Sequence, residues 1–317
     1  MADMVFSGVT FSGGYSITLP PPTYSTYAIF GYGLNGGGDL SMTNLVSNTG
    51  VVATDTTGVG TARSALAAAG YGNDKAIFGY GSISGVGPVS ITNLVSNTGV
   101  VSTDTTGVGT ERRFIAAAGY GTDKAIFGYG LDSSARTAVT NLVSNSGIVA
   151  TDTTGVGTAR YGPAAAGYGS DKAIFGYGTT GTSTAITNLV SNAGVVATDT
   201  TGVGTARAYL AAAGYGTDKA IFGYGQTAGS ATSVSMTNLV SNTGVVATDT
   251  TGVGTARTQI AAATYGSDKV IFGYGSTTAS NYVSITNLVS NTGVVATDTT
   301  GVGTARNGLA AASYGSS

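Results

Sequence analysis

The sequence predicts an all-β protein in which six repeated, four-stranded antiparallel units close into a ring. The hexapeptide AIFGYG returns with a period of roughly 48 residues, which is typical of stacked or circular repeat proteins. Between its copies, short β-branched and aromatic runs alternate with turns rich in Gly, Asn and Asp. No run keeps the apolar period of about 3.6 residues that an amphipathic helix shows. The copies begin at Ala28, Ala76, Ala125, Ala173, Ala220 and, as VIFGYG, Val270.

Residues 1–26 precede the repeats. Apolar residues alternate in this segment and three consecutive prolines follow, which predicts one or two short strands and then a polyproline spacer. We interpret the segment as a docking arm, because strands without a partner expose unpaired edges. A tail that packs on the repeats is the alternative. The apolar residues assigned to the docking arm are Val5, Phe6, Val9, Phe11, Tyr15 and Ile17.

Each repeat contains four predicted strands, which the second copy shows most clearly. They cover residues 65–71, 75–81, 89–96 and 100–104, and turns containing Gly, Asn and Thr join them. Four antiparallel strands in a period of about 40–50 residues are typical of a β-propeller blade. Because one such sheet is too small to be stable alone, we expect each blade to obtain its core from its neighbours.

Small residues in each repeat fit this arrangement. Three consecutive alanines, residues 67–69 and their equivalents, suit the innermost strand, where blades crowd around the axis. Gly79 and Gly81 flank Tyr80. We expect these glycines to let neighbouring backbones approach while the tyrosine packs between blades.

The two ends of the chain each carry part of one repeat. The first repeat starts at its second strand, residues 27–33, and the chain ends with a first strand that has no repeat of its own, residues 308–314. Pairing of these two strands would complete one blade, close the ring and remove two free edges. The sequence therefore predicts one repeat domain, residues 27–317, with the fold of a six-bladed β-propeller.

The run ARSALAAAGYGNDKAIFGYG, residues 62–81, is followed by a variable loop, by ITNLVSNTG and by another Arg. This arrangement resembles a kelch repeat, which has an Arg, a small apolar first strand, a strand ending in paired glycines, a tyrosine, and an Asn-Thr turn before a tryptophan. The chain differs in two places, since GYG replaces the paired glycines and Val100 stands at the tryptophan position. The resemblance covers residues 27–317 and implies a propeller that serves mainly as an interaction module.

Composition excludes several functions. Only 9% of the 317 residues are charged and the formal net charge is −2, so the chain offers no basic surface to nucleic acid or to an anionic membrane. Cys and His are absent, which removes disulfides, thiolate metal sites and the commonest general base. We expect neither a membrane-spanning segment nor a secretory signal, because no run of about 18 apolar residues and no leader pattern is present.

The charged residues recur with the repeat. Every repeat has one Arg after TTGVGT and one Asp in its fourth strand, and five repeats have an Asp-Lys pair at a turn. A catalytic site needs unlike groups that converge with separated pKa values, so we interpret these identical charges as turn caps and blade-to-blade ion pairs. We predict no enzymatic activity, no catalytic residue, no cofactor and no metal. A Ca²⁺-binding ring of aspartates is the alternative.

Variation between the repeats is confined to two windows. One lies between the second and third strands and the other directly follows the repeated Arg, and in an antiparallel four-stranded blade both lie on the same face. Loops on a rigid scaffold commonly carry recognition, and Tyr and Asn are adaptable contact residues. Drift in tolerant surface loops is the alternative. The candidate binding residues on this face are Arg113, Phe114, Asp132, Arg136, Tyr161, Tyr209, Gln226, Gln259, Asn281 and Tyr282.

We predict a non-enzymatic binding or structural protein. Near-identical repeats, low charge and the N-terminal stretch FSGVTFSGGYSI resemble virion proteins of tailed bacteriophages. This resemblance implies a tail, fibre or capsid-surface component of the virion that docks to other virion proteins through residues 1–26. The resemblance is also compatible with a homo-oligomeric protein in the particle. The variable loops would then bind a glycan or a protein on the host surface.

Three alternatives stay open at this point. A multivalent lectin would gain avidity from several weak sites. A purely structural scaffold or decoration protein would have no ligand at all. A kelch-like oxidase or hydrolase would need unlike polar groups at the axis, which the repeated sequence does not offer.

Overall fold

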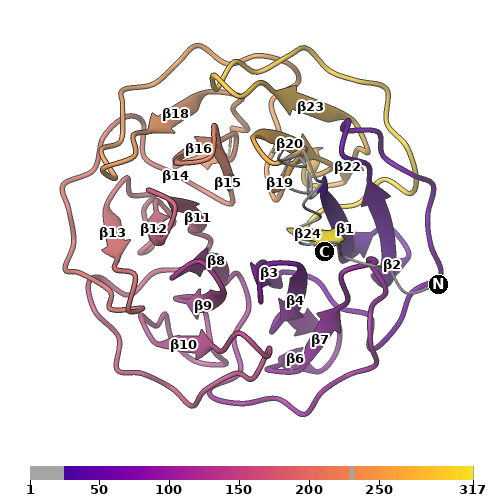
Figure 1. Ribbon diagram of the computed structural model, residues 1–317, viewed down its shortest axis with the longest axis horizontal. Coiled ribbons are helices and arrows are strands. Elements are labelled where there is room, and N and C mark those ends of the chain that lie inside the picture. Colours follow the sequence, from indigo (N-terminus) through magenta and orange to yellow (C-terminus); the bar gives the residue numbers. More distant parts are fainter. Residues whose placement is uncertain (1–24, 229–231, 317) are drawn as a thin grey trace, which may run out of the picture.

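The computed structural model describes residues 25–228 and 232–316, and within them every regular element is a β-strand. Six three-stranded antiparallel sheets lie around a common centre (Figure 1). The prediction of an all-β fold built from repeated small antiparallel sheets is therefore confirmed. The residues assigned to the docking arm, Val5, Phe6, Val9, Phe11, Tyr15 and Ile17, lie outside the described part of the chain.

One strand of each sheet lies nearest the centre (Figure 1). In the second sheet Ala67, Ala69 and Tyr71 are buried and alternate with half-buried residues, so each inner strand turns alternate side chains toward its neighbours. Alanine suits this crowded position, as expected from the sequence. The inner strands are β3 (Ala67–Tyr71), β8 (Ala116–Tyr120), β11 (Ala164–Tyr168), β15 (Ala211–Tyr215), β19 (Ala261–Tyr265) and β24 (Ala310–Ser316).

The middle strand of each sheet is buried along nearly its whole length. In the second sheet Ala76, Ile77 and Phe78 have no exposed surface, because the neighbouring sheets cover both faces of the strand. This explains why AIF is a continuous apolar run instead of an alternating one. The middle strands are β4 (Lys75–Gly79), β9 (Lys124–Gly128), β12 (Lys172–Gly176), β16 (Lys219–Gly223), β20 (Lys269–Gly273) and β1 (Ser25–Asn35).

The third strand of each sheet carries the sequence TNLV. Within each sheet it pairs antiparallel with the middle strand, in the register that places Asn93 opposite Phe78 in the second sheet. The third strands are β7 (Thr92–Val95), β10 (Thr140–Val143), β13 (Thr187–Val190), β18 (Thr237–Val240), β23 (Thr286–Val289) and β2 (Gly38–Val46).

The predicted fourth strand is not a regular strand, which corrects the expectation of four-stranded units. In the second sheet, residues 100–105 contact β7 through isolated antiparallel bridges on either side of Asn93. The side-chain Nδ2 of Asn93 donates hydrogen bonds to the carbonyl oxygen of Ser102 (3.0 Å) and to Oδ1 of Asp104 (2.9 Å). Because a side chain supplies these bonds, the outer segment follows the sheet edge without forming a regular ladder.

The two ends of the described chain complete one sheet. Strand β24 pairs antiparallel with β1, from Ser25 opposite Ser316 to Gly31 opposite Ala310, as the phase of the chain ends predicts. Strand β1 begins at Ser25, so the predicted boundary after residue 26 falls inside this strand. Each inner strand also contacts the inner strands of the two adjacent sheets, in the cyclic order β24, β3, β8, β11, β15, β19 and back to β24.

The hydrophobic core consists of six clusters, each formed by two adjacent sheets. Between the second and third sheets the ring of Tyr80, which is fully buried, meets Phe127 with their centroids 5.1 Å apart. The expectation that this tyrosine packs between units is confirmed. Complete burial of a phenylalanine stabilises the fold by about 1.5–3 kcal/mol, so each interface contributes substantially to stability.

Candidate functional site

The two variable windows pair with each other in every repeat. Tyr161 bridges to Thr179, and Thr258 bridges to Ser276. In the fifth repeat the windows form the short strands β14 (Arg207–Ala208) and β17 (Gln226–Thr227), and hairpins within single windows form β5 (Ser82–Ile83) with β6 (Gly87–Pro88) and β21 (Ser276–Thr278) with β22 (Asn281–Tyr282).

Both windows therefore lie on one face, as expected. We call this surface the variable face. It comprises the described residues of 64–65, 113–114, 161–163, 208–209, 258–259 and 307–308, and of the loops 34–42, 82–91, 131–139, 179–186, 226–236 and 276–285.

A closed ring of six backbone hydrogen bonds lies at the centre of the variable face. The residue two positions after each repeated arginine donates its N–H to the carbonyl oxygen of its counterpart one repeat earlier, at 2.7–3.0 Å. The first member bonds in this way to the last, which closes the circle. We call these residues the axial ring: Ala65, Phe114, Gly162, Tyr209, Gln259 and Gly308.

All six residues of the axial ring have a left-handed backbone, with φ between 52° and 62°. This conformation costs a non-glycine residue roughly 1–2 kcal/mol, and the closed set of hydrogen bonds offsets that cost. The backbone of the ring is therefore the same in every repeat while its side chains differ.

Aromatic side chains from three consecutive repeats meet at this ring. The ring centroid of Phe114 lies 5.2 Å from that of Tyr209 and 6.0 Å from that of Tyr161, and the two tyrosine rings are 6.1 Å apart. The guanidinium of Arg113 lies 5.8 Å from the centre of Phe114, and that of Arg136 lies 6.0 Å from Tyr161. We call these five residues the aromatic cluster. Burial and the nearby Tyr161 raise the pKa of Tyr209.

A cavity of about 480 Å³ adjoins the aromatic cluster. Two polar atoms of its lining residues are buried without a hydrogen-bond partner, namely Nε of Arg113 and Oδ1 of Asn307. Asn307 is only 7% exposed, and its Nδ2 donates to Oγ of Ser276 at 3.2 Å. We call this space the Arg113 cavity; its lining includes Ser64, loop 82–87, Arg113, Phe114, Gln259 and Asn307.

The structure thus brings six of the ten predicted binding residues to one place, since Gln259 belongs to the axial ring beside the aromatic cluster. The other four stabilise their own loops. Asp132 accepts hydrogen bonds from the backbone N–H of Ser134 and Ala135. Gln226 pairs in β17, and Asn281 and Tyr282 form β22, where Nδ2 of Asn281 donates to Thr277.

Sequence reasoning missed Asn307 and loop 82–87 as cavity residues. Both lie inside the variable windows, so the repeat comparison marked their positions. It did not show that Asn307, near the end of the chain, and Arg113, which precedes β8, would line one cavity.

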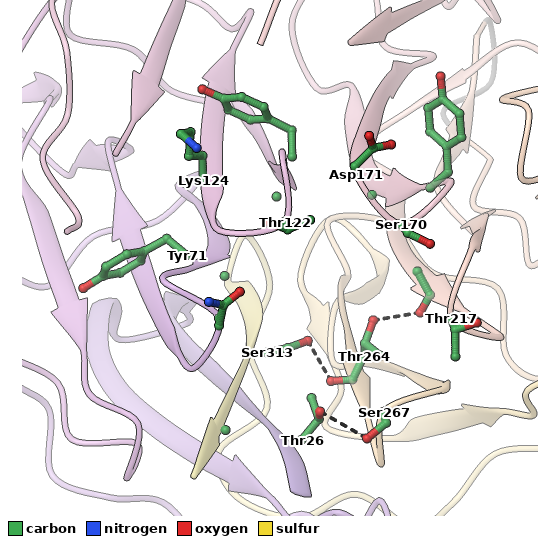
Figure 2. A pocket seen from close by; sticks show the side chains of 18 of the residues that line it. Thr26, Tyr71, Thr122, Lys124, Ser170, Asp171, Thr217, Thr264, Ser267 and Ser313 are labelled. Carbon is green, nitrogen blue, oxygen red and sulfur yellow. Dashed lines mark hydrogen bonds between the residues drawn. The ribbon is translucent and has the colours of Figure 1, made fainter. Parts of the chain in front are cut away.

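The opposite end of the axis is uniform. Strand β3 runs from the axial ring to the turn at Gly72, and a second cavity, of about 300 Å³, opens at that end (Figure 2). Figure 2 shows Thr122 and Lys124 on one hairpin beside this second cavity, and Ser170 and Asp171 on another. We call this end the uniform face, formed by the turns at residues 72–74, 121–123, 169–171, 216–218 and 266–268.

Charges on the uniform face are balanced within each turn. Nζ of Lys124 lies 2.8 Å from Oδ1 of the adjacent Asp123, and the same pairing recurs in the four other Asp-Lys turns. The hydrogen bond from Lys124 lowers the pKa of Asp123. A second closed set of backbone bonds joins these turns, for example from Gly72 N–H to the carbonyl of Asp123 at 2.8 Å. The expected turn-capping role of these charges agrees with this geometry.

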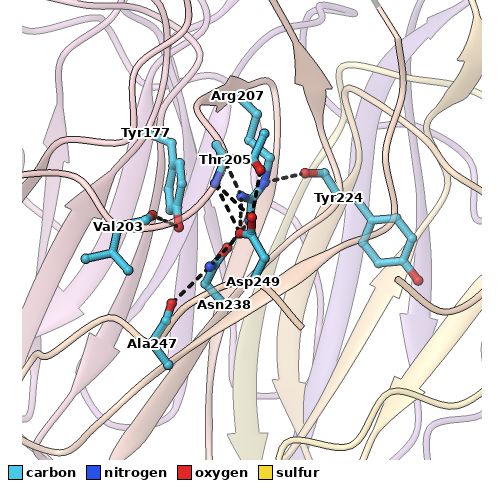
Figure 3. Close-up of polar contacts among 8 residues, drawn as sticks. All are labelled: Tyr177, Val203, Thr205, Arg207, Tyr224, Asn238, Ala247 and Asp249. Carbon is cyan, nitrogen blue, oxygen red and sulfur yellow. Dashed lines mark hydrogen bonds and ion pairs between the residues drawn. The ribbon is translucent and has the colours of Figure 1, made fainter. Parts of the chain in front are cut away.

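The repeated arginines lie between adjacent sheets. Arg207 is fully buried, and its guanidinium lies 4.4 Å from the ring centre of Tyr177 in the preceding sheet (Figure 3). Its Nε donates to the carbonyl of Tyr224 at 2.9 Å and its terminal nitrogen to Oδ1 of Asn238 at 2.6 Å. Burial lowers the pKa of Arg207, while the nearby Tyr177 and Asp249 raise it in part.

The repeated aspartates also connect adjacent sheets. The carboxylate of Asp249 accepts hydrogen bonds from N–H (2.9 Å) and Oγ1 (2.6 Å) of Thr205, which belongs to the preceding linker. Burial raises the pKa of Asp249, but the bonds from Thr205 and Asn238 lower it and prevail.

In the described part of the chain, the ion pairs of the repeated arginines lie within single sheets and do not join one sheet to the next, contrary to the expectation. Among the described residues, ion pairs of repeated arginines are limited to Arg207 with Asp249 (3.8 Å) and Arg306 with Asp55 (3.9 Å). The main partners of these arginines are tyrosine rings, carbonyls and asparagines. The repeated arginines therefore contact the adjacent sheet through a tyrosine ring, and the prediction of blade-to-blade ion pairs is wrong for the described residues.

In the part of the chain that the structure describes, no group of three or more acidic side chains is arranged to hold a metal ion. Within residues 25–228 and 232–316, no helix has the length and apolar character needed to cross a membrane. No protein-family model matches the chain, and no curated protein is significantly similar to it in sequence. The kelch and bacteriophage resemblances stay predictions. Val100, at the kelch tryptophan position, is 65% exposed.

Proposed function

We propose that the chain is a kelch-like six-bladed β-propeller that binds a ligand through its variable face and catalyses no reaction. The cyclic contacts of the inner strands and the pairing of β24 with β1 support the propeller. The observation that carries the binding function is the aromatic cluster, because it gathers three aromatic rings and two arginines that the repeat pattern does not produce.

Repeated and non-repeated side chains have different surroundings. Arg207 packs its guanidinium on Tyr177 of the preceding sheet, and Asp249 accepts a hydrogen bond from Thr205 in the linker between the two sheets. Arg113 and Phe114 lie half-buried beside an open cavity. Half-buried aromatic and arginine side chains are the residues that most often dominate binding energy at protein surfaces. A recognition role accounts for this division better than loop drift does.

The experiment that tests the proposal is binding of the labelled full-length protein to whole bacterial cells, to a glycan panel and to a panel of cell-surface proteins. A control variant carries the sequence of residues 179–186 in the loop between the second and third strands of every repeat, and the sequence of residues 64–66 directly after every repeated Arg. These changes preserve the scaffold and make both variable windows uniform. Binding by the native protein alone supports recognition by the variable face. Equal binding by both proteins, or binding by neither, contradicts it and favours a purely structural role.

We also propose attachment to a virion through the N-terminal segment. Its test is a deletion that stops at residue 24, because β1 begins at Ser25 and the carbonyl of Thr26 accepts a hydrogen bond from Gly266. The shortened protein should fold and lose incorporation into particles. Unchanged incorporation would contradict the proposed attachment.

A further inference from the structure

We propose that the Arg113 cavity binds one carboxylate-bearing sugar residue, with the guanidinium of Arg113 holding the carboxylate and the surrounding polar groups holding hydroxyls. This rests on the proposed binding function and specifies its ligand as an acidic saccharide.

Arg113 is a half-buried cation that forms no ion pair with the described residues. The lysines and the other arginines of the chain recur with the repeat, except Arg136. No carboxylate of the described residues forms an ion pair with Arg113, and its buried Nε has no hydrogen-bond partner. A partly buried cation without a counter-charge is unfavourable, and a ligand carboxylate would relieve this because guanidinium and carboxylate form paired hydrogen bonds.

The neutral polar side chains that line the cavity can form hydrogen bonds with a ligand. Asn307 contributes a buried Oδ1 that lacks a donor, which a sugar hydroxyl could supply. Ser64, Ser82 and Gln259 also line the cavity and can both donate and accept hydrogen bonds. The site thus contains one cation, one hydrogen-bond acceptor without a donor, and several side chains that can both donate and accept hydrogen bonds. These groups match a ligand that carries one carboxylate and several hydroxyls.

The size and the aromatic lining of the cavity also suit a sugar residue. The volume of about 480 Å³ falls within the range of about 300–1,000 Å³ that small-molecule sites usually have. The ring of Phe114 lines the cavity and packs against the ring of Tyr209, with an interplanar angle of 73° and 5.2 Å between the ring centroids. It offers a rigid apolar surface for the C–H face of a sugar ring.

Arg113 is the only charged residue at its position in the six repeats. At the position of Arg113 the other repeats carry Ser64, Tyr161, Ala208, Thr258 and Asn307, none of which is charged. The inference is therefore one acidic-sugar site per chain, unlike the several equal sites of a multivalent lectin.

Isothermal titration of the full-length protein tests the inference. The probes are an oligosaccharide containing glucuronic acid, a second containing N-acetylneuraminic acid, the carboxyl-reduced form of each, and a short peptide with one glutamate. We expect at least one acidic oligosaccharide to bind with a stoichiometry near one, its carboxyl-reduced form to bind at least tenfold more weakly, and added salt to weaken binding.

Two substitutions refine the test. Arg113→Ser places at this position the residue that the preceding repeat already has, so the fold should persist while affinity falls at least tenfold. Lys124→Gln removes a cation on the uniform face, outside the lining of the Arg113 cavity, and should change affinity less than twofold.

The outcomes separate this inference from the proposed function. Equal binding of acidic and reduced sugars, or unchanged binding by R113S, overturns the inference. Cell binding that depends on the variable loops, with no binding of either acidic oligosaccharide or with preference for the peptide, overturns the acidic sugar and keeps the proposed function. Absence of any loop-dependent binding overturns both.

Discussion

The backbone N–H of Phe114 donates a hydrogen bond of 2.8 Å to the carbonyl oxygen of Ala65, its counterpart one repeat earlier. Repeated six times, this bond closes the axial ring and fixes where the most variable side chains of the chain stand. The same backbone position therefore carries alanine in one repeat, an aromatic residue in another and glycine in a third. The uniform backbone of the repeats and the proposed recognition surface therefore meet at this position.

The left-handed backbone of the axial ring predicts opposite effects for two substitutions of one residue. Gln259 has a φ of 53°, so Gln259→Gly should raise the free energy of unfolding by up to about 1 kcal/mol, whereas Gln259→Val should lower it by about 1 kcal/mol or more. Chemical denaturation measures both. Equal effects of Gly and Val would show that the strain at this position is unimportant.

Buried arginine between the sheets predicts a large loss on truncation. Arg207→Met leaves the carbonyl of Tyr224 and Oδ1 of Asn238 without their donors, and should cost about 3 kcal/mol. The matched control is Lys124→Gln on the uniform face, whose ion pair is solvent-exposed and should contribute little. Comparable unfolding midpoints for the two variants would contradict the inter-sheet role of Arg207.

The repeated aspartates predict instability in acid. Their pKa values are lowered in the folded state, for Asp249 because the bonds from Thr205 and Asn238 outweigh the effect of burial. Their contribution is thus complete above the unfolded-state pKa and is lost as the pH falls below about 4. Stability measured by denaturant titration between pH 7 and pH 2.5 should stay flat and then decline. Asp249→Asn should reduce the decline, and an unchanged profile in that variant would contradict this origin.

The buried tyrosines predict a second loss of stability in alkali. Burial raises the pKa of Tyr80 and Tyr224 to about 12, although the neighbouring arginines lower it in part. A raised folded-state value means that the contribution is present below the unfolded-state pKa of about 10 and disappears as the pH rises toward 12. Absorbance of ionised tyrosine should therefore rise together with the loss of β-sheet circular dichroism. Ionisation that precedes unfolding would refute this coupling.

Much of this fold could be predicted from the sequence because repetition makes each local signal recur. The small first strand ending at Tyr314 predicted its pairing with β1, and Gly79 and Gly81 predicted the packing of Tyr80 between sheets. Comparison of the copies predicted that the two variable windows share a face. These features follow from strand order and residue size alone.

Other features depend on side-chain geometry that a repeat pattern does not reveal. The amide of Asn93 replaces a regular ladder with side-chain bonds, so the predicted fourth strand became an irregular segment. The sequence predicts turn caps and blade-to-blade ion pairs for the repeated charges, yet the guanidinium of Arg207 lies over Tyr177 of the preceding sheet. Non-glycine residues such as Phe114 adopt a left-handed backbone, which local sequence does not favour. Asn307 and Arg113 line one cavity although they are far apart in the sequence, an arrangement that depends on the pairing of β24 with β1.

The most direct measurement for recognition by the variable face compares cell binding of two double variants of the full-length protein. Phe114→Ala with Tyr209→Ala removes two aromatic side chains of the aromatic cluster. Alanine should be tolerated at both positions of the axial ring, because Ala65 occupies the equivalent position in another repeat. Lys124→Gln with Lys172→Gln changes the uniform face to the same extent. We predict at least a tenfold loss of binding for the first variant and no loss for the second. Equal binding by both, or a loss confined to the lysine variant, would contradict recognition by the variable face.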